Sequence, residues 1–205
     1  MSREPWPDPF GAEPRWSAVP PASIVPVPAA QAGELRGRRV IVGLPGLGWR
    51  ADMRGDDRVV QGSRTFVPVL GEHEWYRAEA EQIEVFAPLM PIERVWVETV
   101  APAATRPPTP PSRQPEPVSR LVSLDAPPRR DPIAALDVPV VTGRRVVQSA
   151  EGVERRDLRA VTELYSNAGG DVCLRVTTEL EWYRWAWSGK SPPTLEVPVH
   201  SLWVE

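Results

Sequence analysis

Glu74-Trp75-Tyr76-Arg77 occurs a second time in this chain, as Glu181-Trp182-Tyr183-Arg184, 107 residues later. Two other pairs of identical peptides keep the same order and nearly the same spacing: Gly37–Val40 with Gly143–Val146, and Trp96–Glu98 with Trp203–Glu205. Chance rarely places three matched peptides in register, and self-similarity at a fixed period is the signature of a duplicated structural unit. The sequence therefore predicts two tandem copies of one fold.

The copies span residues 37–98 and 143–205, and each is preceded by proline-rich chain. Of the 26 prolines in 205 residues, 19 lie in residues 1–36 and 99–142, and this density favours extended, solvated backbone. We therefore expect an extended arm (1–36), a first module (37–98), a Pro-rich linker (99–142) and a second module (143–205).

Composition narrows the class of protein. Cys173 is the single cysteine, which excludes an internal disulfide and a cysteine-based metal site. The chain has no run of 18 apolar residues and no charged segment followed by an apolar run at its start. We therefore expect a cytoplasmic protein without a membrane partner.

Turn residues divide each copy into short apolar segments, which is typical of strands in an all-β module. For the first copy we expect strands over residues 38–42, 49–54, 65–70, 73–78, 83–86 and 94–97. For the second copy we expect residues 172–187 to form one long strand or a bent pair. Residues 24–28 and 136–141 occupy similar places ahead of the two copies, and 24–28 is expected as an edge strand because proline is confined to edges. Little helix is expected anywhere.

About five short strands in roughly 62 residues, a long first loop and a final strand after a Pro-marked turn resemble the SH3-like barrel class, which includes SH3, Tudor and KOW-type modules. This resemblance implies two tandem SH3-like barrels. It is one of strand count and loop rhythm, so it implies no residue roles. An OB-like barrel, which needs longer strands, is the alternative.

Arginine and aspartate alternate in both copies. Strand periodicity would place Arg50, Asp52 and Arg54 on one face of the sheet. The second copy has the same pattern at Arg155, Asp157 and Arg159. Two guanidinium groups held apart by a carboxylate can contact an anion. The alternative is a surface ladder of ion pairs that contributes little stability.

Tryptophans shared by the copies are interpreted as core residues, namely Trp75, Trp96, Trp182 and Trp203. The alternative is that the Glu-Trp-Tyr-Arg peptides line a groove for an extended peptide.

Trp49, Trp185 and Trp187 have no counterpart in the other copy, so they are candidates for contact with a partner or between modules. On a strand, Trp185 and Trp187 would share a face with Tyr183 and lie opposite Trp182. Trp6 and Phe10 in the arm are further candidate anchors.

The sequence offers few candidate catalytic residues. His73 and His200 are the only histidines, and neither recurs in the other copy. Cys173 corresponds to Phe66, which indicates a small buried hydrophobic residue rather than a nucleophile. Glu72 and Glu74, which recur as Glu179 and Glu181, are interpreted as solvated carboxylates on an exposed strand face. We expect no catalytic residue, no cofactor and no metal site.

Two functions remain open. The first is a non-catalytic adaptor or structural protein that binds a protein partner or self-associates. The second is nucleic-acid binding through an arginine-rich front, because residues 36–64 carry seven arginines and three acids. The net charge of −3 favours the first, since high-affinity nucleic-acid binding usually needs several phosphate contacts.

Overall fold

The computed structural model describes residues 20–44, 48–101, 126–150 and 153–205. The chain divides into two compact units. The first unit holds residues 22–131 together with 183–190, and the second holds residues 132–182 and 191–205 together with residues 20 and 21.

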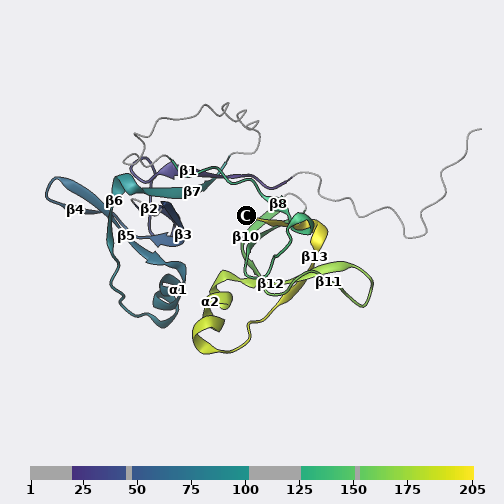
Figure 1. The fold of residues 1–205 in the computed structure, drawn as a ribbon. Coiled ribbons are helices and arrows are strands. Elements are labelled where there is room, and N and C mark those ends of the chain that lie inside the picture. The colour runs from purple at the N-terminus through teal and green to yellow at the C-terminus, as the bar shows by residue number, and fades with distance from the viewer. Residues whose placement is uncertain (1–19, 45–47, 102–125, 151–152) are drawn as a thin grey trace, which may run out of the picture. The chain divides into compact units, whose positions relative to one another are not determined.

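The first unit is built on one antiparallel sheet that curls into a half-barrel (Figure 1). Its strands are β1 (Ile24–Pro28), β2 (Arg39–Leu44), β3 (Gly48–Gly55), β4 (Val59–Gln61), β5 (Arg64–Gly71), β6 (Leu89–Pro91) and β7 (Val95–Val100). They run in the order β1-β7-β2-β3-β5-β4, and β6 also pairs with β5. Helix α1 (Glu72–Glu81) follows β5, and a 3-10 turn, η1 (Ile92–Arg94), precedes β7.

The second unit repeats this plan strand for strand. Its strands are β8 (Ile133–Ala134), β9 (Arg145–Ala150), β10 (Val153–Ala160), β11 (Tyr165–Ser166), β12 (Val172–Thr178), β13 (Leu195–Pro198) and β14 (Leu202–Val204). Their order, β8-β14-β9-β10-β12-β11 with β13 also on β12, is that of the first sheet. Helix α2 (Glu179–Ser188) follows β12, and the 3-10 turns η3 (Ala135–Asp137) and η4 (Val199–Ser201) precede β9 and β14. The mostly β, duplicated fold is therefore confirmed.

Each half-barrel encloses its own apolar core. In the first unit, Val40 and Val42 of β2 point inward with Met53, Val67 and Val97. The core of the second unit is formed by these residues: Ala135, Val141, Val146, Leu158, Ala160, Leu174, Val176, Val197, Val199, Leu202 and Val204. Full burial of each valine or leucine contributes about 1.5–3 kcal/mol. On β2, Val40 and Val42 belong to the core and Ile41 does not, as the two-residue period of a strand predicts.

The two Glu-Trp-Tyr-Arg peptides lie on helices, so the strands expected at 73–78 and over the second half of 172–187 are wrong. Residues 77–81, Arg-Ala-Glu-Ala-Glu, are all good helix formers, and acidic residues in the first turn suit the helix dipole. Helix α1 ends at Gln82, which adopts a left-handed conformation with φ 52° and donates its backbone N–H to the Ala78 carbonyl.

Other strand predictions have mixed outcomes. The edge strand at 24–28 is confirmed as β1, which pairs only with β7 among the strands of its sheet. No strand forms at 83–86, which has no regular secondary structure. Ahead of the second copy, β8 lies at 133–134, and residues 135–137 form a 3-10 turn rather than part of a strand at 136–141. None of the helices in the described ranges has the length and apolar character needed to cross a membrane.

Candidate functional site

A β-bulge in each copy decides which way the arginines point. Val40 pairs with Met53 while Val42 pairs with Arg50, so β3 advances by three residues where β2 advances by two. Asp52 lies within this bulge and adopts a positive φ of 58°. Cross-strand partners share a face, so Arg50 lies on the core side of the sheet and Arg54 on the opposite side. The expectation that both face one way is wrong, because it assumed an unbroken two-residue period.

The second copy has the same irregularity. Val146 pairs with Leu158, and Gln148 pairs with Arg155. Arg155 therefore shares the core face with Leu158, and Arg159 lies on the outer face opposite Arg145.

The first residue of each helix is a glutamate with a buried carboxylate, which contacts two arginines on the outer face of the sheet. Glu72 Oε1 lies 3.0 Å from Arg54 Nε and 3.8 Å from Arg39 Nε. In the second unit, Glu179 Oε1 lies 3.2 Å from Arg145 Nε and 4.0 Å from Arg159 Nε. The Glu72 and Glu179 side chains are 0% and 1% exposed, so their interpretation as solvated carboxylates is wrong. We refer to each glutamate with its two arginines as a Glu-Arg-Arg cluster.

The same arginines also fix the turn before each inner strand. Arg54 donates from Nη1 to the Gly37 carbonyl at 2.8 Å, and Arg159 donates to the Gly143 carbonyl at 2.9 Å. These glycines adopt φ values of 70° and 79°. A Cβ added to Gly37 would lie 3.5 Å from Trp75, and one added to Gly143 would lie 3.6 Å from Trp182.

Two of the recurring peptides, the one with the glycine turn and Glu-Trp-Tyr-Arg, therefore meet in one place within each copy. The glycine turn, the bulged arginine and the helix with its tryptophan are far apart in sequence, yet each contacts the next. This explains why these motifs recur together: they assemble the fold.

The expected anion contacts are placed as follows. Arg54 and Arg159 contact Glu72 and Glu179. Arg155 donates from Nε to Asp157 at 2.8 Å, and both side chains are exposed. Arg50 lies on the core side of β3, and its side chain is exposed.

Aromatic side chains gather around α1 in the first unit. Tyr183 donates its hydroxyl hydrogen to Glu72 Oε2 at 2.9 Å, and its ring stacks on Tyr76 with centroids 5.4 Å apart. The Trp187 ring meets His73 edge to face at 5.8 Å. Residues 183 and 187 are one helical turn apart and so share a face, whereas Trp185, 36% exposed, does not. The expected single stripe of Tyr183, Trp185 and Trp187 is wrong because α2 is a helix.

The remaining tryptophans occupy different environments. Trp49 packs edge to face against Trp96 with ring centroids 4.9 Å apart. Trp96 is buried, and Trp75, Trp182 and Trp203 are half-buried. Trp6 and Phe10 lie outside the described residues.

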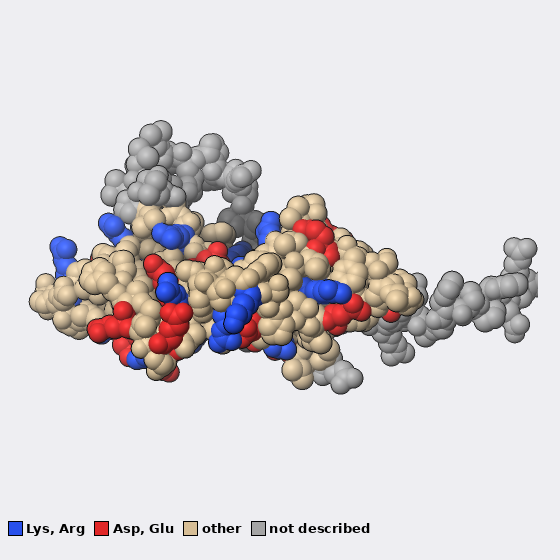
Figure 2. Space-filling view, turned by 90° about the horizontal axis from the view of Figure 1, so that it is seen from below, with Lys and Arg blue, Asp and Glu red and all other residues tan. Residues whose placement is uncertain are grey.

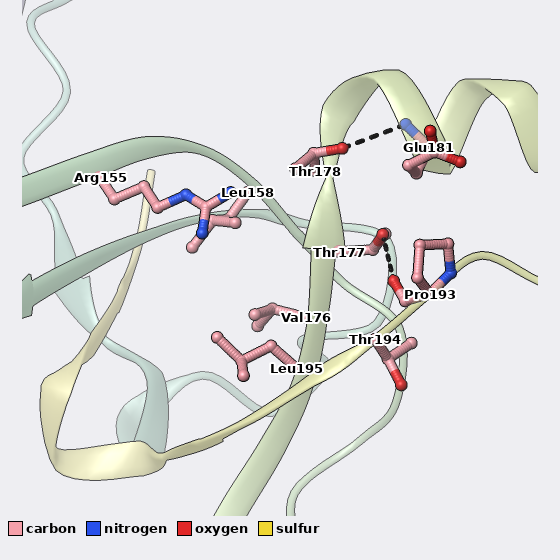
Figure 3. Close-up of a pocket in the computed structure, with 9 residues that line it drawn as sticks. All are labelled: Arg155, Leu158, Val176, Thr177, Thr178, Glu181, Pro193, Thr194 and Leu195. Carbon is pink, nitrogen blue, oxygen red and sulfur yellow. Dashed lines mark hydrogen bonds between the residues drawn. The ribbon is translucent and has the colours of Figure 1, made fainter.

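An open apolar cleft lies in the second unit (Figure 3). It has a volume of about 230 Å³ and is lined by Arg155, Leu158, Val176, Thr177, Thr178, Glu181, Pro193, Thr194 and Leu195. Leu158 and Val176 belong to the core, so the cleft reaches into the interior of the half-barrel. Leu195 is 51% exposed.

Strand pairing and two hydrogen bonds join the segments that line the cleft. Leu195 pairs with Val176 at the start of β13. Beyond that pair, Thr177 donates from Oγ1 to the Pro193 carbonyl at 2.8 Å, which holds the incoming segment beside β12. The Glu181 backbone N–H donates to Thr178 Oγ1 at 3.3 Å at the start of α2. Figure 3 shows Arg155 and Glu181 at opposite ends of the group, so the cleft has one basic end and one acidic end.

Sequence reasoning identified one residue of this cleft, Arg155, as a site candidate, and did so for a different reason. The cleft is formed by β10, β12, α2 and residues 193–195, which are distant in sequence. The two adjacent prolines Pro192 and Pro193 were a visible signal, but they indicate only a turn.

Two perturbed groups in the second unit follow from their surroundings. Burial raises the pKa of the Cys173 thiol, so it stays protonated at neutral pH. Hydrogen bonds from Thr142 and from the Val141 backbone lower the pKa of Glu163. The Glu163 carboxylate accepts the backbone N–H groups of Val141 at 3.1 Å and Thr142 at 3.2 Å.

Charges of both signs are interspersed on the face of the molecule in Figure 2. Within the described ranges, His, Cys, Asp and Glu side chains form no group of three or more that could hold a metal ion. No protein-family model, no curated protein and no solved structure matches this chain.

Proposed function

We propose that this chain is a non-catalytic adaptor or structural protein, built from two SH3-like barrels, whose second barrel binds an apolar side chain of a protein partner. The cleft of the second unit carries this proposal. In this function the Pro-rich arm and linker serve as tethers or ligands, and the protein is cytoplasmic.

The shape and chemistry of the cleft suit a side chain presented by an extended segment. Its floor is apolar, formed by Leu158, Val176 and Leu195. An engineered apolar cavity of about 150 Å³ holds benzene, so a cleft of about 230 Å³ has room for one aromatic or branched side chain. Arg155 and Glu181 at the two ends give a bound segment a preferred direction.

A binding role also agrees with the groups that line the cleft. They include no histidine or cysteine, and Glu181 is their one carboxylate. General acid–base catalysis usually uses a group whose pKa is tuned near neutral pH. The cleft is therefore interpreted as a recognition site rather than a reaction centre.

Fluorescence anisotropy with labelled peptides tests this function. The peptides each carry one aromatic or leucine anchor beside an acidic residue, and the full chain is the titrant. We expect saturable binding that Leu195→Glu weakens by more than about tenfold, because a charge in the apolar floor opposes insertion. Leu136→Glu is the matched control, since Leu136 and Leu195 are both 51% exposed. Equal binding by the two variants would reject the cleft as the binding site.

Nucleic-acid binding remains the alternative prediction. The contacts of Arg54, Arg145 and Arg159 with buried glutamates weigh against it, because these charges are already paired. A gel shift with DNA or RNA that disappears at high salt would support this alternative, since phosphate contacts release counterions.

A further inference from the structure

We propose that the cleft of the second unit binds the Ile83–Leu89 segment of a second copy of this chain, with Phe86 as the inserted side chain. The inference rests on the proposed function and names its partner. The observations that carry it are the exposure of Phe86, the size of the cleft and the distribution of charge along both surfaces.

Phe86 is 88% exposed, which leaves almost the whole ring in contact with water. It lies between α1 and β6, in residues 83–88, which have no regular secondary structure. Ile83 and Leu89, each three residues away, are 44% and 36% exposed. Three exposed apolar side chains within seven residues make this segment a candidate interaction site.

The cleft matches this side chain in size and character. Its volume of about 230 Å³ exceeds the roughly 150 Å³ that accommodates benzene. Leu158, Val176 and Leu195 supply apolar contacts for a ring. Residues 83–88 have no strand or helix to unfold before insertion, and Leu89 is the first residue of β6.

Charge favours one direction of binding. The two acids nearest Phe86, Glu81 and Glu84, lie on its N-terminal side, and residues 87–92 carry no charge. Glu84 placed over Arg155 therefore puts the uncharged part of the segment beside Glu181. Arg155 now pairs with Asp157, and such exposed pairs contribute little and exchange easily.

The contact is reciprocal between two copies. Each chain carries one Phe86 segment and one cleft, so two insertions related by a two-fold axis close a dimer. The second insertion is then intramolecular within the complex and strengthens it through effective concentration.

Sedimentation equilibrium of the full chain over a range of concentrations tests the proposal. We expect a monomer–dimer equilibrium, and Phe86→Ser should raise its dissociation constant by about 10- to 100-fold through loss of the buried ring. Val60→Ser is the matched control, because Val60 is another exposed apolar residue of the first unit, at 71%. A wild-type chain that stays monomeric, or equal effects of the two variants, would overturn the proposal.

A mixing experiment checks the pairing. Phe86→Ser keeps an intact cleft and Leu195→Glu keeps an intact Phe86, so their mixture should form a heterodimer with one insertion although each alone is impaired. The absence of a heterodimer would count against the paired contact.

A labelled peptide of residues 80–91 separates this inference from the proposed function. It should bind the Phe86→Ser chain and be weakened by adding Leu195→Glu. If other apolar-anchor peptides bind the cleft and this one does not, the self-association fails while the proposed function stands. If no peptide binding depends on Leu195, both fail.

Discussion

The two copies share their Glu-Arg-Arg clusters but differ on the outer faces of their sheets. The first copy packs Trp49 edge to face against Trp96. The second copy has Glu154 at the position of Trp49. Arg156 Nη2 lies 2.7 Å from Glu154 Oε2, and Arg156 also forms an ion pair with Glu205. The shared contacts therefore build the fold, whereas the outer faces have diverged from an apolar pair to an ionic one.

A second difference concerns the chain that leads into β2 and β9. In the first copy, Arg58 donates to the carbonyls of Ala29 at 2.7 Å and Gly33 at 2.9 Å. In the second, Glu163, 105 residues later, accepts backbone N–H groups instead. One position thus contacts the chain before the inner strand in both copies, with opposite charge and at different residues.

The largest expected loss of stability follows from substitutions in the Glu-Arg-Arg clusters, which the two copies share. Glu72→Gln and Glu179→Gln each remove a buried carboxylate that contacts two arginines, and breaking a buried pair costs about 3–5 kcal/mol. Urea unfolding should show both variants strongly destabilised. Asp157→Asn, which removes an exposed partner of Arg155, should cost about 0–1 kcal/mol. If urea unfolding showed either glutamate variant to be as stable as the wild-type chain, the two clusters would not be equivalent.

Tryptophan substitutions should destabilise the two copies to different extents. Trp96→Ala removes a buried ring that contacts Trp49 and should cost about 3–5 kcal/mol. Trp203→Ala should cost less, because Trp203 is half-buried. Hydrogen exchange of β2 and β9 amides would assign each loss to its unit, and a larger loss for Trp203→Ala would contradict the comparison.

Glycine substitutions should affect the two copies equally. Gly37→Ala and Gly143→Ala place a side chain in the left-handed region, which costs about 1–2 kcal/mol. The tryptophans at 3.5 and 3.6 Å are in ordinary contact with the added methyl, so little further loss is expected. Thermal unfolding of both variants measures this, and unequal shifts would show that the turns are not equivalent.

The smallest expected effect is a difference in acid sensitivity. The pKa of Glu163 is lowered in the folded chain, so its contribution is present above the ordinary value of 4.5 and is lost as the pH falls through the folded pKa. The first copy has Arg58, which carries no carboxyl group, at the equivalent position. Amide exchange at Val141 and Thr142 should therefore accelerate in acid relative to the chain at 29–33, and Glu163→Gln should abolish that difference. Parallel acceleration in both segments would contradict it.

The duplication and most strands could be predicted from the sequence, because recurring peptides and apolar alternation are local signals. Glu-Trp-Tyr-Arg could not be assigned from four residues, since so short a peptide fits a period of 2 or 3.6. The helix formers Ala78 to Glu81 were the signal for α1, whereas the aromatic residues at 185 and 187 favour strand in the second copy.

The arginine faces and the cleft depend on information that is not local. A bulge inserts one residue into a strand, so every later side chain lies on the opposite face of the sheet. The sequence around Asp52 and Asp157 does not reveal the bulges. The cleft requires that Arg155, Val176 and Leu195 meet, which only the strand order determines.

Amide NMR of the full chain during titration with an apolar-anchor peptide tests most directly the claim that the cleft of the second unit is the binding site. We expect chemical-shift changes to concentrate at the cleft residues Arg155, Val176, Thr194 and Leu195 and to disappear in Leu195→Glu. Changes concentrated instead around Trp49 and Trp96, with the cleft amides unmoved, would contradict it.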